Sequence, residues 1–223
     1  MGDDGPTTRT WDDTKWQRYG LLSGIVFVVL GLAALFVPGA PPARDGSAES
    51  IAKYFLDNDK IKVAAILFGF ALIFGAWWLG SFWRVISRLE SGGPRLAFIA
   101  AAGFIGALGV TSVGQAMFTV PEMRPGLAGS TEFAYEFAYV AFGLGAAFIA
   151  AHMLALAALT LRSGFLPKWM GWLALASSMI CVVGTISAGT QSEFFASFQW
   201  VGYLTWLLWV LLASVLLSMR KEA

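Results

Sequence analysis

Six long apolar blocks dominate this sequence and restrict the folds that it can adopt. They cover residues 19–37, 61–84, 95–118, 133–161, 168–188 and 199–219. Each block reaches the roughly 20 helical residues that cross about 30 Å of hydrocarbon. The chain is 57% hydrophobic and 13% charged, whereas a soluble domain carries about 25% charged residues. The sequence therefore predicts an all-α integral membrane protein, a bundle of six transmembrane helices.

Short connections separate the blocks, and none is long enough to form a soluble domain. We expect a single six-span transmembrane domain over residues 19–219, with tails at 1–18 and 220–223. Within the first connection, residues 47–58 place Ile51, Tyr54 and Phe55 on one face. This spacing predicts a short amphipathic helix along the membrane surface.

The distribution of Lys and Arg predicts the orientation, because basic residues are retained on the cytoplasmic side. With the N-terminus inside, ten lie on that side: Arg9, Lys15, Arg18, Arg84, Arg88, Arg95, Arg162, Lys168, Arg220 and Lys221. Five lie on the other: Arg44, Lys53, Lys60, Lys62 and Arg124. Both tails are therefore predicted to be cytoplasmic.

The first block is expected to be a retained span. Four acids, Asp3, Asp4, Asp12 and Asp13, precede it, whereas a cleaved signal peptide prefers a basic start and a shorter apolar core. Cleavage of this block remains the alternative.

Composition excludes several classes of function. A net charge of +1 without a dense basic run argues against nucleic acid as a partner. The single cysteine and the single histidine argue against a disulfide, a bis-histidine haem and a histidine-rich metal site, so no cofactor or metal is predicted. No catalytic template is present. Ser177 and Ser178 lack a nearby base in the sequence, and we expect them to bond to their own helix.

His152 lies ten residues before Arg162, about 15 Å into the bilayer and near its midplane. Ionisable residues at this depth are costly, and they tend to face a cavity or a partner. His152 is therefore a candidate ligand contact or proton-relay group. The alternative is a neutral histidine that makes one interhelical hydrogen bond.

A second set of polar residues falls near the outer ends of the spans. Glu132 and Glu136 are one turn apart, and such like charges require a cation or water. Tyr139, Gln115 and Gln199 reach a similar depth. Together with Glu136 they are predicted to line an outward-facing ligand pocket, or else to be solvated interfacial residues.

Rows of small residues mark the third and fourth spans. Gly103, Ala107, Thr111 and Gly114 lie in one, and Gly143, Ala147, Ala151 and Ala155 in the other. Small residues let helices approach closely where lipid removes the hydrophobic drive between them. We therefore expect these two spans at the centre of the bundle.

The entry to the fifth span reads Leu166-Pro167-Lys168-Trp169-Met170-Gly171-Trp172-Leu173. These eight residues and the hydropathy plan resemble uncharacterised families of small six-span bacterial membrane proteins. The resemblance implies the same topology, and such families have no agreed activity to carry over. Together with the charge bias and the lack of disulfide cysteines, the resemblance makes the bacterial inner membrane the expected location. The motif also has a physical account: proline in the first turn, a boundary cation and two interfacial indoles.

Three functions remain open. The first is a non-enzymatic protein that binds membrane lipids or a small apolar molecule, or that serves as a subunit of a homo-oligomer or larger membrane assembly. The second is a secondary transporter or channel that uses the outward-facing pocket. Helices broken at the midplane would favour it, but here the prolines fall in the connections. A lipid-modifying membrane enzyme comes third, because no nucleophile, base and metal gather.

Overall fold

The computed structural model describes residues 13–123 and 131–220, and all regular secondary structure in these ranges is helical, without a strand. The elements are α1 (Asp13–Phe36), α2 (Ala48–Leu56), α3 (Lys60–Ile86), α4 (Arg95–Met123), α5 (Thr131–Ser163), α6 (Lys168–Thr185), the 3-10 helix η2 (Ile186–Gly189) and α7 (Glu193–Ser218). Six of them are long and apolar enough to cross a membrane, which suggests an integral membrane protein. The predicted tails lie largely outside the described residues.

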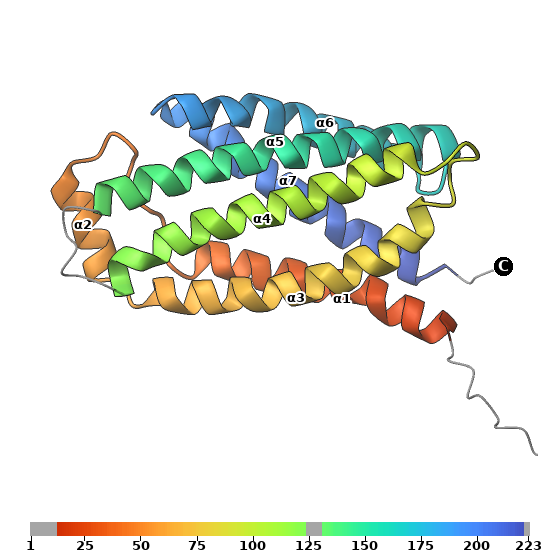
Figure 1. Ribbon diagram of the computed structural model, residues 1–223, viewed down its shortest axis with the longest axis horizontal. Coiled ribbons are helices and arrows are strands. Elements are labelled where there is room, and N and C mark those ends of the chain that lie inside the picture. The colour runs from red at the N-terminus through yellow and green to blue at the C-terminus, as the bar shows by residue number, and fades with distance from the viewer. Residues whose placement is uncertain (1–12, 124–130, 221–223) are drawn as a thin grey trace, which may run out of the picture.

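The six long helices form a bundle in which most chain neighbours pack side by side (Figure 1). Helix α1 packs on α3 and α7, α3 on α4, α4 on α5, α5 on α6, and α6 on α7. The six long helices therefore form a closed ring of neighbours. Helix α2 lies at one end of the bundle (Figure 1), which we call the α2 end.

The prediction of a central pair of spans is correct for α5. Buried residues follow one another along its whole length, whereas α4 is no more buried than α1. Helices α4 and α5 still approach closely. A Cβ atom added at Gly103 would lie 2.8 Å from the backbone nitrogen of His152 and from the carbonyl oxygen of Phe148.

Two segments differ in detail from the sequence-based expectation. Helix α4 continues to Met123 and includes Pro121 in its final turn, where one missing N–H donor disturbs few helical bonds. Helix α2 begins after Ser47, whose side chain accepts a hydrogen bond from the Ser50 N–H. Its apolar face is turned onto the bundle: Phe55 is fully buried, and its ring centroid lies 4.9 Å from that of Phe118.

The start of α6 is arranged as the physical explanation of the motif at residues 166–173 predicts. Pro167 is the residue before the first helical turn, and the indoles of Trp169 and Trp172 are exposed. On the opposite face Met170 is buried, and its carbonyl accepts a hydrogen bond of 3.0 Å from Trp209 Nε1. The motif therefore combines an outward aromatic surface with an anchor for α7.

The contact between α4 and α5 predicts opposite effects for two glycines of one helix. Gly103→Ala forces two backbones apart and should destabilise the protein by about 1–3 kcal/mol. Gly109, where an added Cβ meets nothing within 4 Å, is the control: Gly109→Ala should stabilise by about 0.5–1 kcal/mol, because alanine favours helix. Thermal unfolding in detergent measures both, and equal effects would contradict the close contact.

Candidate functional site

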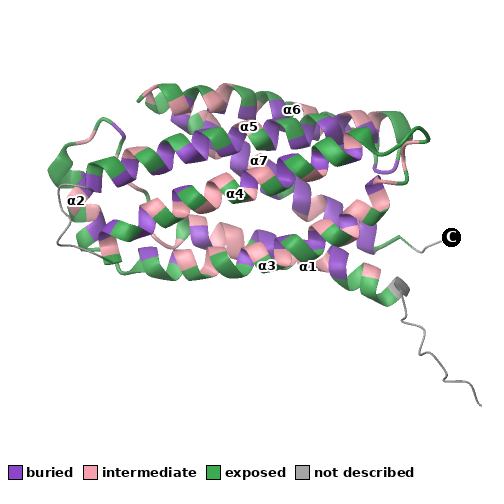
Figure 2. Ribbon diagram, in the orientation of Figure 1, coloured by how far each residue is buried: buried purple, intermediate pink, exposed green. Residues whose placement is uncertain are grey.

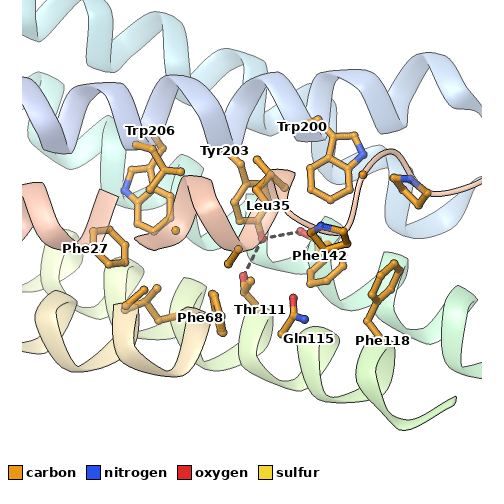
Figure 3. A pocket seen from close by; sticks show the side chains of 18 of the residues that line it. Phe27, Leu35, Phe68, Thr111, Gln115, Phe118, Phe142, Trp200, Tyr203 and Trp206 are labelled. Atoms are coloured by element: carbon orange, nitrogen blue, oxygen red, sulfur yellow. Dashed lines mark hydrogen bonds between the residues drawn. The ribbon is translucent and has the colours of Figure 1, made fainter. Parts of the chain in front are cut away.

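An apolar cavity opens inside the bundle towards the α2 end (Figure 3). Its volume is about 110 Å³, comparable with the roughly 150 Å³ of an engineered apolar cavity that binds benzene. Its walls come from α1, α3, α4 and α7, with Phe142 from α5 and Tyr54 from α2. The lining is rich in aromatic rings: Phe27, Tyr54, Phe68, Phe118, Phe142, Trp200, Tyr203 and Trp206.

Small residues leave the space that these rings do not fill. Gly31, Ala34 and Ala71 line the cavity from α1 and α3. A Cβ added at Gly31 would have its nearest neighbour, an atom of Leu207, at 3.8 Å. A larger side chain at this position would therefore extend into the cavity without displacing backbone.

Several polar groups interrupt the apolar lining, among them the hydroxyls of Thr111, Tyr203 and Tyr54, the Gln115 amide and Trp206 Nε1, which has no partner among the described residues. Thr111 and Tyr203 lie with their hydroxyl oxygens 2.8 Å apart, and the Tyr203 hydroxyl donates to the carbonyl of Phe142 at 3.1 Å (Figure 3). Gln115 lies one turn beyond Thr111, and its amide has no hydrogen-bond partner within the described ranges. No charged residue lines the cavity in the described part of the chain.

The phenol of Tyr54, at the edge of the cavity, is also uncharged. Its hydroxyl lies 3.4 Å from the carbonyl oxygen of Pro38. Burial, with a smaller effect of Tyr139, raises the pKa of Tyr54 to about 12. The phenol is therefore uncharged at physiological pH, and the cavity offers hydrogen bonds but no net charge.

A buried arginine, Arg44, holds in place the α1–α2 connection, which forms one side of the cavity. The Arg44 side chain is only 2% exposed. Its Nη1 donates to the carbonyls of Ser187 (2.7 Å) and Thr190 (2.6 Å), and its Nη2 donates to Glu136 Oε2 at 2.6 Å. Its backbone N–H donates to Glu193 Oε1 at 2.6 Å. The α1–α2 connection is thus fastened to α5, η2 and α7.

Tyr139 and Tyr135 complete this attachment. The Arg44 guanidinium lies 5.0 Å from the ring centroid of Tyr139, within cation–π range. The Tyr135 hydroxyl donates to the carbonyl of Pro42. Pro38, Gly39 and Pro41 of the same connection line the cavity. The residues around Arg44 therefore fix one wall of the cavity.

The structure separates the five predicted ligand-binding residues into three places. Glu136, Tyr139 and Gln199 belong to the network around Arg44, because Gln199 Oε1 accepts from Ser187 Oγ at 2.6 Å and Ser187 also bonds Arg44. Gln115 alone lines the cavity. Ligand contact by Glu136, Tyr139 and Gln199 stays a prediction.

His152 lies apart from the other four. It is fully buried, and its Nδ1 lies 2.6 Å from the carbonyl oxygen of Ala100 on α4. Its ring sits beside Phe104 and Trp206, with centroids 5.5 and 6.4 Å away, while Nε2 has no partner in the described ranges. The interhelical hydrogen bond that the sequence left as an alternative is therefore present.

Sequence reasoning missed Arg44 as a site residue, although a signal for it existed. Glu132 and Glu136 require a nearby cation, and Arg44 provides it from 92 positions before Glu136.

The prediction for Ser177 and Ser178 is wrong. Ser177 bonds Thr205 at 2.9 Å, and Ser178 donates to the carbonyl of Ala150, also at 2.9 Å, because buried hydroxyls here find partners across helix contacts.

The described residues contain no group of three or more His, Cys, Asp or Glu side chains placed to hold a metal ion. Comparisons of the chain with protein-family models, with curated proteins and with solved structures gave no match in any of the three. The resemblance at residues 166–173 therefore rests on those residues and on the hydropathy plan.

Removing the Arg44 charge should destabilise the α2 end. Arg44→Gln leaves Glu136 and two carbonyls without their donor, and breaking one side of a buried ion pair costs about 3 kcal/mol. Glu136→Gln should cost at least as much, because it leaves the Arg44 guanidinium, whose side chain is only 2% exposed, without its counter-charge, whereas the Glu136 carboxylate left by Arg44→Gln is 32% exposed. Thermal unfolding in detergent is the measurement, with Glu132→Gln, an exposed neighbour on the same helix, as the control. An unchanged midpoint for Arg44→Gln would contradict the assigned role.

Proposed function

We propose that the chain is inserted in a bilayer through its six long helices, with both termini in the cytoplasm and the α2 end outside. Exposed residues lie along the outward faces of the helices (Figure 2), and many of them are large and apolar, among them Ile66, Phe70, Ile105 and Leu154. In water such a surface would be costly, whereas lipid accommodates it. The excess of Lys and Arg at the end opposite α2 supports this orientation, and we take the bacterial cytoplasmic membrane as its location.

The orientation predicts which connections a membrane-impermeant thiol reagent reaches in intact cells. In a Cys181→Ala background, Ser47→Cys next to α2 should be labelled, and Ser91→Cys between α3 and α4 should be labelled only after the membrane is permeabilised. Both positions are exposed. The reverse pattern would overturn the N-in, C-in arrangement.

Within the membrane, we propose that the protein is non-enzymatic and binds a neutral apolar molecule, a lipid or a small hydrophobic compound, in the cavity. The observation that carries this proposal is the lining itself: aromatic walls, no charge in the described residues, and an unpartnered amide on Gln115. Binding sites for small apolar ligands combine such a surface with a few polar groups that fix orientation. A ligand of this kind also reaches the site from the lipid phase.

Transport of the bound molecule is the second candidate. The network around Arg44 favours it, because this network holds the connection that forms one cavity wall. Release of Arg44 from Glu136 would free that wall. Transport predicts that Glu136→Gln changes flux of a probe through liposomes, whereas a binding protein without transport shows no flux in either form.

Filling the cavity should abolish binding without harming the fold. Gly31→Leu places a side chain in the open space beside Leu207 and also replaces a helical glycine. The control is Gly69→Leu, at an exposed position of α3 where an added Cβ meets nothing within 4 Å. Saturable binding of the fluorescent apolar probe N-phenyl-1-naphthylamine to protein in nanodiscs is the measurement.

We expect wild type and Gly69→Leu to bind this probe alike, and Gly31→Leu to bind at least about tenfold more weakly, since a bulky side chain in a pocket removes contacts worth more than 1.4 kcal/mol. Equal binding by a folded Gly31→Leu protein would contradict the cavity as the site. Native mass spectrometry of mildly extracted protein then identifies a retained lipid, metabolite or partner subunit and tests the predicted homo-oligomer or assembly.

A further inference from the structure

The hydrogen-bond directions inside the cavity restrict the chemistry of its ligand. The carbonyl of Phe142 can only accept, so the single proton of the Tyr203 hydroxyl points to it. The bond between Tyr203 and Thr111 must then use the Thr111 proton. Thr111 therefore has no donor left, and its oxygen offers only acceptor capacity to a ligand.

The burial of Tyr203 supports these hydrogen-bond directions. The side chain is 8% exposed. A Cβ atom added at Gly145 would lie 2.3 Å from the Tyr203 oxygen and 2.8 Å from Thr111 Oγ1, so helix α5 closes directly over the pair. The two hydroxyls therefore have little freedom to exchange hydrogen-bond partners, and the Thr111 oxygen can still accept a hydrogen bond from a ligand.

Gln115 adds the complementary group. It is one helical turn from Thr111, and residues at this spacing share a helix face. Both side chains point into the cavity from α4 (Figure 3). The Gln115 amide supplies two N–H donors and an acceptor, and none of them has a partner among the described residues. A ligand group between these side chains meets an acceptor at Thr111 and a donor at Gln115.

We infer that the cavity selects an apolar alcohol, a molecule whose single polar group is a hydroxyl placed between Thr111 and Gln115. A hydroxyl donates one hydrogen bond to Thr111 Oγ1 and accepts another from the Gln115 amide. An ether, a ketone or an ester only accepts, so the Thr111 oxygen would keep its bond to Tyr203 but would accept none from the ligand. A carboxylate or an ammonium group would be a charge without a counter-charge in the lining, which is strongly unfavourable. This inference rests on the proposed function, because it names the ligand class of the same site.

The test compares two compounds of which the second has a methyl group in place of the hydroxyl proton of the first. Benzyl alcohol and benzyl methyl ether share a ring of the size that an apolar cavity of roughly this volume binds, and each is used to displace N-phenyl-1-naphthylamine from protein in nanodiscs. In wild type the alcohol should displace the probe at about tenfold lower concentration, as expected for one added hydrogen bond. In Thr111→Val and in Gln115→Leu this preference should fall to about twofold or less.

Two further variants separate the hydroxyl contact from general packing. Thr111→Ser keeps the oxygen and should keep the preference. Ser112→Ala changes the neighbouring residue, whose hydroxyl is engaged with the Leu108 carbonyl of its own helix at 2.6 Å, and should also keep it. Loss of the preference in Ser112→Ala would overturn the assignment to Thr111.

The outcomes distinguish this inference from the proposed function. If alcohol and ether displace the probe equally from the wild type, the cavity binds apolar molecules and the selection of an alcohol is wrong. If neither displaces the probe from the wild type, and Gly31→Leu binds the probe as the wild type does, the cavity is not a binding site and both proposals fail.

Discussion

The arrangement of the α2 end depends on one buried cation. Taking a guanidinium out of water is costly unless its charge and its donors are matched, and Arg44 meets most of this need with a carboxylate, two carbonyls and the face of a tyrosine. Its Nε has no partner among the described residues. The two carbonyls belong to Ser187 and Thr190, in and just after η2. Helix ends leave such carbonyls without intrahelical donors. Arg44 therefore stabilises the end of the α6–η2 segment while it fixes the α1–α2 connection.

The two halves of the bundle interior are packed differently, and this difference locates the cavity. Away from α2, large rings stack on one another: Trp78 and Phe82 lie with centroids 4.5 Å apart, and Phe82 also contacts Trp209 and Phe165. Towards α2, small residues of α1 and α3 face the rings of α4 and α7 across open space. Small residues occur in both halves, but the rings of the first half fill the space beside them: a Cβ atom added at Gly24 would lie 2.3 Å from Trp78, whereas one added at Gly31 would have its nearest neighbour 3.8 Å away.

Polar groups buried between apolar helices need partners within the protein, and this need explains where most of the hydroxyl side chains lie. Some buried atoms still lack a partner among the described residues, among them Thr160 Oγ1, Gln199 Nε2 and Trp206 Nε1. Several hydroxyls donate to the carbonyl one turn earlier, as Ser112 and Thr119 do on α4. Others join helices, as Ser178 joins α6 to α5 and His152 joins α5 to α4. Gln115 is an exception that faces a cavity, which is why its amide is available to a ligand.

The sequence by itself determined the six long helices, because runs of about 20 apolar residues between breakers allow little else. Their exact ends were not determined, since α4 continues past residue 118 to Met123. It also pointed to the close contact at Gly103, to the exposed indoles of Trp169 and Trp172, and to a cation required by Glu136. Tertiary structure alone decided which cation that is, since Arg44 and Glu136 are 92 positions apart and no local pattern links them. It alone decided, too, that Gln115 faces a cavity while Gln199 is bonded to Ser187. Both are glutamines at similar predicted depth, and their surroundings come from helices distant in the sequence.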